Sequence, residues 1–390
     1  MDATAERLAG WVSRLVQIPS VNPMHAGPKS GVPGERAMAE AVADVAEGLG
    51  AHGVVLDDVV DGRPNVYARF AGHTDRLVVL DVHTDTVTVE HMVEDPFDGR
   101  TEREHVWGRG ALDTKASLGV VLALLEAWRA EGLRPTPTLL VVGSISEEAG
   151  GLLGAKAFRR WADEQGLRPH QLVVAEPTEL APVFGHKGGV ALRLTVHGRS
   201  AHSATPHLGQ NAIVAMAPVI TALAGEHERL VAAEATTELG TGTLTMTIID
   251  GGTGGNVVPD RCSLQVGRRI VPGEDPEAEF ERIAALATTA CPLPLEATTV
   301  IAIEPGEPRG SRAFHQSAET ALVQSLAKWA GTSPTIAPFG TNALKYDGFA
   351  DEKAVFGPGR ITDAHRETEC VAIADLVRLA QVFTSWLEPR

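Results

Sequence analysis

The chain has 390 residues, 44% hydrophobic and 22% charged, which is long enough for two globular domains. Its formal net charge of −16, without a basic stripe, argues against a nucleic-acid partner. Its three cysteines, Cys262, Cys291 and Cys370, are odd in number and far apart, which argues against a disulfide framework or a thiolate zinc site and favours a reducing cytoplasm.

The first half of the chain alternates short apolar runs with helical patterns. Strands are predicted at 54–60, 65–70, 77–82, 138–145 and 171–175, and helices at 4–17, 34–49, 115–131 and 153–165. This alternation indicates crossover units and an α/β fold with a mixed, mostly parallel sheet flanked by helices. The first helix lacks the apolar core of a signal peptide, and no run approaches the ~18 apolar residues of a membrane span. We therefore expect no membrane partner.

The pattern changes near residue 186. Strand, helix, strand, strand, helix and strand are predicted in turn at 189–198, 211–223, 242–250, 261–271, 276–289 and 295–303. This order is typical of a two-layer α+β domain with both helices on one face of the sheet. Helices at 312–330 and 373–387, with a strand at 354–356, then return to the first domain. We expect a first domain at 1–186 and 306–390, and an inserted domain at 187–305.

Acidic and imidazole residues recur where the predicted strands end. They are His83 with Asp85, the pair Glu147-Glu148, Glu176, Asp113 just before a helix, and His365 in a glycine-rich loop. Each has an ordinary explanation when taken singly, such as a solvated pair or a helix cap. Strand ends of one sheet meet at one edge, however, and so many acids there would repel one another unless cations bind.

Carboxylate and imidazole ligands without thiolate favour zinc, with cobalt or manganese as alternatives. Two divalent ions outweigh the charge of Asp113, Glu148 and Glu176, and would lower the pKa of a bridging water. Because adjacent residues do not easily both reach one metal, we predict Glu148 as a ligand and Glu147 as the general base. Two such ions about 3.5–4 Å apart would hold a carbonyl oxygen and the attacking hydroxide together.

Ordered motifs run along nearly the whole chain. They include Ile18-Pro19-Ser20-Val21-Asn22-Pro23, His83-Thr84-Asp85, Gly108-Arg109-Gly110, Ala175-Glu176-Pro177-Thr178, Ala201-His202-Ser203, Gly255-Asn256-Val257-Val258-Pro259, Gly357-Pro358-Gly359, and Ala364-His365 with Glu369. Together they resemble the co-catalytic zinc aminoacylase and exopeptidase family. That family includes acetylornithine deacetylase, succinyl-diaminopimelate desuccinylase, aminoacylase and carboxypeptidase G, and its fold is a zinc-exopeptidase-like catalytic domain with an inserted lid domain.

The resemblance implies a role for each matched residue. His83 and Glu176 would hold one zinc ion, Glu148 and His365 the other, and Asp113 would bridge them, with a cis peptide before Thr114. Asp85 would orient His83, Glu147 would be the base, and His202 of the lid domain would stabilise the oxyanion. The implied substrate-binding residues are Asn256, Arg269, Gly340 and Asn342. Two departures from the family bear on specificity: Gly267 replaces a frequent acid near Arg269, and Asn342 replaces a frequent aspartate.

We therefore expect a dizinc metallohydrolase that removes the acyl group from an N-acyl amino acid, most similar to acetylornithine deacetylase. A desuccinylase, or a dipeptidase or carboxypeptidase with the same site, is the alternative, and a non-catalytic binding protein is a third reading. The resemblance also implies a homodimer formed through the lid domain.

Overall fold

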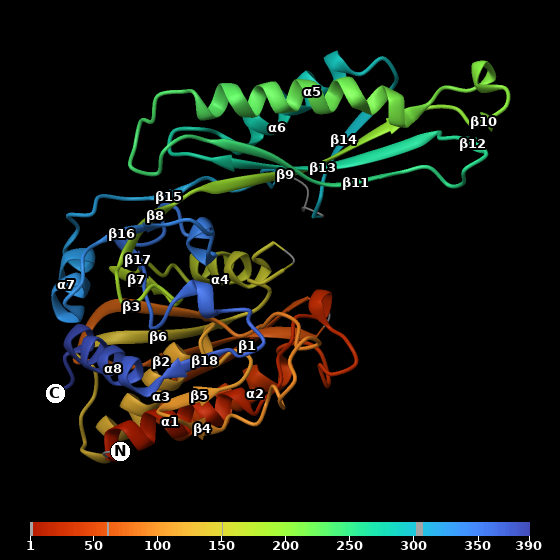
Figure 1. Ribbon diagram of the computed structural model, residues 1–390. Helices are drawn as coiled ribbons and strands as arrows, with labels where there is room; N and C mark the ends of the chain where they lie inside the picture. Colours follow the sequence, from red (N-terminus) through yellow and green to blue (C-terminus); the bar gives the residue numbers. More distant parts are fainter. Residues whose placement is uncertain (1–2, 61, 150, 302–306) are drawn as a thin grey trace. The chain divides into compact units, whose positions relative to one another are not determined.

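The computed structural model describes residues 3–60, 62–149, 151–301 and 307–390 and forms two compact units (Figure 1). The first unit comprises Met1–Phe184, Gln316–Ala337 and Thr341–Arg390, and the second comprises Gly185–His315 and Pro338–Gly340. We predicted a second boundary at residue 305, whereas the second unit continues to His315. The reason is that β15 (Phe314–His315) pairs antiparallel with the end of β8 (Val183–His186).

The first unit contains a mixed sheet with a parallel centre. Its strand order is β1 (Gly53–Val60), β2 (Arg63–Phe70), β6 (Pro137–Ser144), β3 (Thr74–His83), β7 (Gln171–Val174), β17 (Glu352–Val355) and then β8, which also pairs with β16 (Thr335–Ala337). Strands β6, β3, β7 and β17 are parallel to one another, and β1 and β2 are antiparallel at one edge. The predicted mixed, mostly parallel sheet is confirmed. Its parallel strands all end at one edge.

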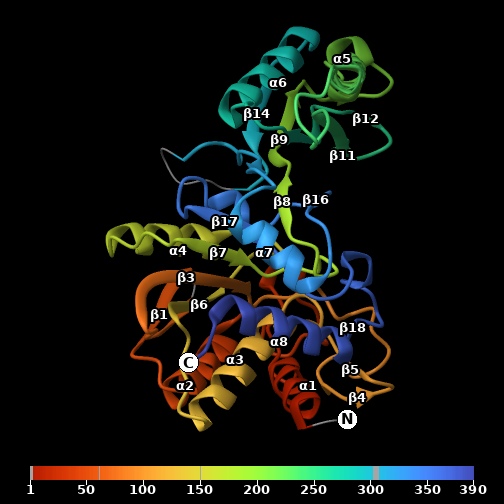
Figure 2. The same cartoon turned by 90° about the vertical axis from the view of Figure 1, so that its left-hand side faces the viewer.

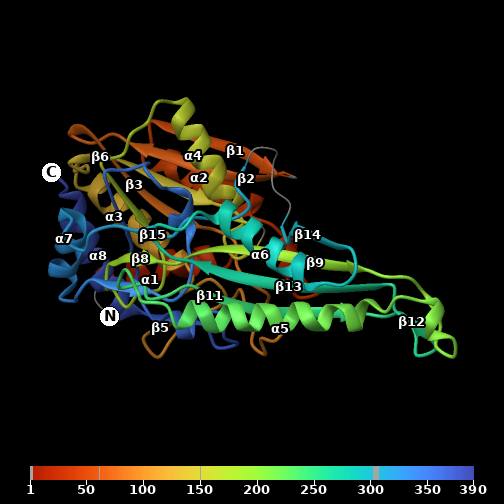
Figure 3. The same ribbon diagram turned by 90° about the horizontal axis from the view of Figure 1, so that it is seen from above.

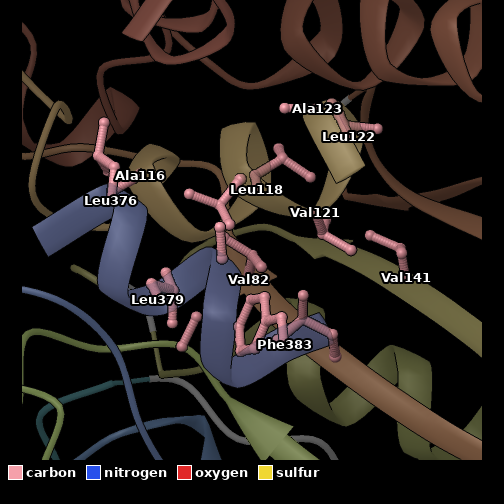
Figure 4. Close-up of a cluster of buried hydrophobic side chains, with 14 of the residues drawn as sticks. Val82, Ala116, Leu118, Val121, Leu122, Ala123, Val141, Leu376, Leu379 and Phe383 are labelled. Atoms are coloured by element: carbon pink, nitrogen blue, oxygen red, sulfur yellow. The ribbon is translucent and has the colours of Figure 1, made fainter. Parts of the chain in front are cut away.

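Helices cover both faces of this sheet (Figure 2). The helices of the first unit are α1 (Ala3–Val16), α2 (Arg36–Gly48), α3 (Lys115–Ala130), α4 (Leu153–Glu164), α7 (Ala321–Ala330) and α8 (Ile373–Leu387). On β3, alternation sends Val78, Leu80 and Val82 into the hydrophobic core that also contains residues of α3 and α8. Figure 4 shows Val82 in this core. Asp81 and His83 therefore lie on the opposite face of the strand.

The second unit is a two-layer sandwich. Its antiparallel sheet has the order β11 (Thr243–Gly251), β13 (Arg261–Ile270), β9 (Gly188–His197) and β14 (Leu295–Thr299). Both helices, α5 (Ala212–Val231) and α6 (Pro276–Ala290), lie on one face of this sheet, with α5 running along β11 (Figure 3). The predicted order of elements is confirmed, although residues 302–303 of the last predicted strand lie outside the described residues. A separate pair joins β10 (Ala201–His202) to β12 (Val257–Val258).

Two features of the first unit differ from expectation. The helix predicted at 312–330 begins only at Ala321, and Phe314–His315, near its predicted start, forms β15 instead. A small antiparallel sheet, β18 (Cys370–Ala372), β5 (His105–Trp107) and β4 (Thr101–Glu102), was not predicted. Among the residues that the structure describes, none of the helices combines the length and apolar character needed to cross a membrane.

Candidate metal centre

The predicted acidic and imidazole residues of the first unit converge at the carboxyl edge of its sheet. His83 ends β3, Glu147 and Glu148 follow β6, and Glu176 follows β7. Asp113 immediately precedes Thr114, the residue before α3, and His365 lies between β17 and β18. These residues come from segments far apart in the chain, and the parallel strands bring them to one place.

Asp113 stands between the two histidines. His83 Nε2 lies 3.0 Å from Asp113 Oδ1, and His365 Nε2 lies 3.3 Å from Asp113 Oδ2. His365 Nε2 also lies 3.0 Å from Glu148 Oε2. One carboxylate oxygen toward each imidazole is the arrangement needed for a carboxylate that bridges two cations. The Asp113–Thr114 peptide bond is cis, which confirms the expectation drawn from the resemblance.

The donor atoms fit divalent cations. Ligand atoms of His83, Asp113 and Glu148 all lie within 4.8 Å of one another, and so do those of His83, Glu147 and Glu176. Glu176 Oε1 is buried and has no hydrogen-bond partner among the described residues. A buried, unpartnered carboxylate oxygen beside other carboxylates is costly, because nothing compensates its lost hydration. Imidazole and carboxylate donors without thiolate suit zinc, cobalt or manganese.

The pKa values of the metal-free cluster also indicate that its carboxylates need a compensating positive charge. Burial, with the nearby carboxylates, raises the pKa of Glu147 to about 8 and of Glu148 to about 7. Hydrogen bonds to Asp113 and Glu148 raise the pKa of His365 to about 10. In the metal-free chain, protons therefore neutralise part of the acidic charge. Divalent cations would perform the same neutralisation with all the carboxylates ionised.

Asp85 contacts His83 in a way that the sequence did not predict. The ring Nδ1 lies 3.0 Å from the backbone carbonyl of Asp85 and 3.7 Å from its carboxylate. A proton donated from Nδ1 to that carbonyl leaves Nε2 as the ligand atom. The Asp85 carboxylate instead accepts the backbone N–H groups of Glu147 and Glu148, at 3.0 and 3.1 Å, and the Asn22 side-chain amide at 2.8 Å.

Buried oxygens hold the first four residues of the loop that carries Glu147. The N–H groups of four consecutive residues, 145 to 148, donate to Asn65, to Glu35 and to the two oxygens of Asp85. Glu35 is itself buried and forms a two-bond ion pair with Arg63, both distances being 2.6 Å. Sequence reasoning missed Asn65 and Glu35, because neither lies in a motif or at a strand end near the site. The loop is preorganised by these contacts.

The other predicted residues lie mainly in the second unit. His202 is exposed on β10, and the Ala204 N–H donates to its Nδ1 at 3.0 Å, so a neutral ring carries its proton on Nε2. Asn256 is adjacent, because its carbonyl accepts from the Ser203 N–H at 2.9 Å. Arg269 is exposed on β13 and, with Gly189 and Gly267, lines a cavity of about 480 Å³. Gly340 belongs to the second unit.

Asn342 is a buried residue of the first unit. It begins a 3-10 helix, Asn342–Lys345, and its Nδ2 donates to Ser144 Oγ at 2.9 Å. Ser144 and Tyr346 each donate to the buried Asp81 carboxylate at 2.7 Å. This network ties the ends of β3 and β6 to the 3-10 helix. The Oδ1 of Asn342 is buried without a partner among the described residues, and its predicted contact with substrate stays a prediction.

Known proteins resemble this chain in sequence and in fold. Residues 184–293 match the peptidase dimerisation domain, and residues 65–174 match peptidase family M28. The acetylornithine deacetylase of Myxococcus xanthus is 31% identical over 334 residues, which cover 84% of each chain. A probable carboxypeptidase of Trichophyton verrucosum is 30% identical over 329 residues, covering 80% of this chain and 70% of the relative. An M20 family metallo-carboxypeptidase of Sulfolobus solfataricus has a similar fold, with a TM-score of 0.76, 18% identity, and coverage of 100% and 99%.

Proposed function

The chain belongs to the M20 family of metallohydrolases, and from that premise we propose that it is a two-metal deacylase of N-acyl amino acids. Membership of this family of amide- and peptide-hydrolysing enzymes confirms the resemblance seen in the sequence. The observation that carries the proposal is Asp113 between His83 and His365, with Glu147 beside Glu148. The 31% identity to an acetylornithine deacetylase supports the finer assignment.

We take the two cation positions from the resemblance to the family, and the contacts of Asp113 with both histidines support its shared role. His83 and Glu176 serve one ion, Glu148 and His365 serve the other, and Asp113 serves both. Zinc is the proposed metal, with cobalt or manganese as alternatives of the same donor chemistry. Bound divalent ions would polarise an amide carbonyl and acidify water at this site.

Glu147 is the proposed general base. Its backbone N–H donates to Asp85, which fixes the start of the side chain beside the donor cluster. Its burial beside the donor cluster raises its pKa to about 8 in the metal-free chain, and bound cations would hold it ionised as a proton acceptor. Glu147 takes a proton from the attacking water and then delivers it to the leaving nitrogen. Glu147 also lies close enough to His83 and Glu176 to ligate a cation, which is the alternative role for this residue.

The second unit supplies the proposed substrate contacts. His202 presents an N–H at Nε2, which suits a donor to the oxyanion of an amide hydrolysis intermediate. Arg269 is exposed and forms no ion pair among the described residues. Its guanidinium can bind a carboxylate through two parallel hydrogen bonds. Asn256, next to His202, is the third proposed contact. Gly340 and Asn342 are kept as proposed contacts on the resemblance alone.

We expect Arg269→Ala to raise KM for an N-acyl amino acid, because the guanidinium binds the carboxylate equally in the ground and transition states. Loss of a charged hydrogen-bonding partner should weaken binding about 10–100-fold, with kcat changed much less. Steady-state kinetics on the free acid and on its methyl ester measures this effect. Arg261→Ala, at the other end of β13, is the matched control. An equal rise in KM for the acid and for the ester would contradict the assignment of Arg269 to the substrate carboxylate.

A peptidase is the second candidate function, because the fungal relative is a probable carboxypeptidase and the archaeal structure is a metallo-carboxypeptidase. The same first-unit residues would cleave either bond. A panel of N-acetyl, N-succinyl and N-formyl amino acids, set against dipeptides, separates the two. Release of acetate or succinate supports the deacylase, while release of free amino acids from dipeptides alone would replace it with the peptidase.

We also propose a homodimer formed through the second unit. The edge strand β11 exposes Ile248 and Ile249, each 55% exposed, and the adjacent α5 exposes Val214 at 67%. These apolar side chains lie within the match to the peptidase dimerisation domain, so a second copy of this chain is the proposed occupant.

The double variant Ile248→Lys/Val214→Glu is expected to be monomeric, because charges replace the apolar contacts of the interface. Sedimentation equilibrium on the full chain measures the mass directly. Val32→Glu, an 85% exposed apolar position of the first unit, is the matched control and should leave the dimer intact. If the double variant is still a dimer, the interface does not depend on these side chains and the proposed interface is wrong.

The three cysteines are free thiols. Burial raises the pKa of the Cys262 and Cys370 thiols, which makes them weak nucleophiles at neutral pH. Unpaired thiols are typical of reducing compartments, and we propose a cytoplasmic location on that basis.

A further inference from the structure

A buried ion pair lies beneath the candidate metal centre. Arg109 and Glu369 are each 1% exposed, and Arg109 Nη1 donates to Glu369 Oε2. Arg109 lies in the loop before α3, and Glu369 immediately precedes β18. The pairing of β18 with β5 aligns Cys370 with Trp107 and brings these two loops together. The pair therefore joins the segment that carries Asp113 to the segment that carries His365.

Glu369 contacts the backbone at Asp113. Its Oε1 accepts the N–H groups of Leu112 and Asp113, at 3.1 and 3.2 Å. These two donors fix the chain just before the Asp113 side chain. Its Oε2 accepts from Arg109, so each oxygen of the Glu369 carboxylate has a hydrogen-bond donor in the loop before α3.

Arg109 contacts the backbone at His365. Its Nη2 lies 3.5 Å from the carbonyl oxygen of His365 and 3.3 Å from His91 Nε2, which is itself 3.3 Å from that carbonyl. His365 has a φ of 62°, a left-handed conformation that residues with a side chain seldom adopt. An unfavourable backbone conformation persists only where surrounding contacts hold it. The guanidinium Nε donates to Thr88 O at 3.2 Å.

We propose that Arg109 and Glu369 are positioning residues that set the separation of the Asp113 carboxylate from the His365 imidazole. This inference rests on the proposed two-metal function, and assigns the pair control over metal affinity at the position shared by Asp113 and His365. The pair contacts backbone atoms, so it acts without touching a cation. Partners that orient metal ligands typically contribute 10–100-fold in metal affinity.

The test is zinc binding to the metal-free full-length protein. In the double variant Arg109→Met/Glu369→Leu both charges are removed together, which avoids leaving one charge buried alone. We expect the zinc equivalent shared by Asp113 and His365 to bind about 10–100-fold more weakly, with a smaller loss at the equivalent shared by Asp113 and His83. The absorption spectrum of the cobalt-loaded protein should change as well, because it reports ligand geometry. Arg268→Met/Glu274→Leu, which removes the ion pair between the buried Arg268 and the partly exposed Glu274 of the second unit, is the control.

Two zinc equivalents bound with wild-type affinity by the folded double variant would overturn the proposal. If that variant does not fold, Glu369→Gln serves instead, because it keeps an acceptor for Asp113 N–H and loses the charge that holds Arg109. It should weaken one zinc equivalent, and unchanged affinity would again overturn the proposal. The readout is metal affinity, so a wild-type protein that binds two zinc ions and hydrolyses no amide would refute the proposed function separately.

Discussion

Replacing Glu147 by glutamine is expected to reduce kcat by about 10²–10⁴-fold while leaving the bound metal unchanged. Glutamine keeps the size of the side chain but cannot accept a proton from water. The backbone N–H of residue 147 would still donate to Asp85, so the loop should keep its place. Steady-state kinetics on an N-acyl amino acid, together with metal analysis of the same sample, measures both quantities.

The neighbouring variant Glu148→Gln distinguishes the two adjacent acids. Glu148 contacts His365 Nε2 at 3.0 Å and is a proposed ligand, so this variant should lose metal as well as activity. Exposed Glu164→Gln, at the end of α4, is the surface control and should behave as the wild type. Activity of Glu147→Gln within a few-fold of the wild type would refute the base assignment. Loss of metal from Glu147→Gln would favour the ligand role.

The metal-free protein is expected to lose stability as pH rises, and zinc is expected to reverse this loss. Glu147 and Glu148 have ordinary pKa values near 4.5 and folded pKa values of about 8 and 7. At pH values between the ordinary and the folded pKa of these two residues, the folded chain holds more protons than the unfolded chain. The free energy of unfolding therefore falls as pH increases. The pKa of His365 is raised from 6.5 to about 10, so its titration lowers the free energy of unfolding as pH increases between those two values.

Zinc replaces these protons, so its binding strengthens as pH rises. Zinc at 1,000 times its Kd adds about 4 kcal/mol to the free energy of unfolding. For a chain of this length that corresponds to a Tm difference of about 5 °C. Thermal scans of metal-free and zinc-loaded protein between pH 5.5 and 8 should show a difference that grows with pH. Glu176→Gln removes one titrating acid and should flatten the metal-free curve. A metal-free Tm that rises through this interval would contradict the electrostatic account.

The parts of the site that could be predicted are those encoded locally. His83 ends an apolar run, Glu147-Glu148 and Glu176 follow two others, and parallel strands must bring such ends together. The supporting contacts are not local. Glu35 reaches the Ser146 N–H across 111 positions of sequence, and Glu369 reaches Asp113 across 256. Neither residue lies at the end of a strand of the central sheet, so no periodicity or spacing identifies its partner.

Asp85 lies on the predicted side of the chain, but its carboxylate has different hydrogen-bond partners from the one predicted. Period-two alternation correctly placed it on the side of His83, at the carboxyl edge of β3. The prediction of a carboxylate–imidazole contact took account of those two residues only. In the structure, unpaired backbone N–H groups of the 145–148 loop compete for the same carboxylate, and two of them bind it. The carbonyl of Asp85 meets the imidazole instead.

The central claim is that Asp113, His83, His365, Glu148 and Glu176 form one two-metal site that supports amide hydrolysis. Zinc titration of the metal-free protein, with release of acetate from N-acetyl amino acids followed at each step, tests it most directly. We predict no hydrolysis without zinc, and activity that rises until two equivalents are bound. Two bound equivalents without hydrolysis of any N-acyl amino acid or dipeptide, or equal hydrolysis with and without metal, would contradict it.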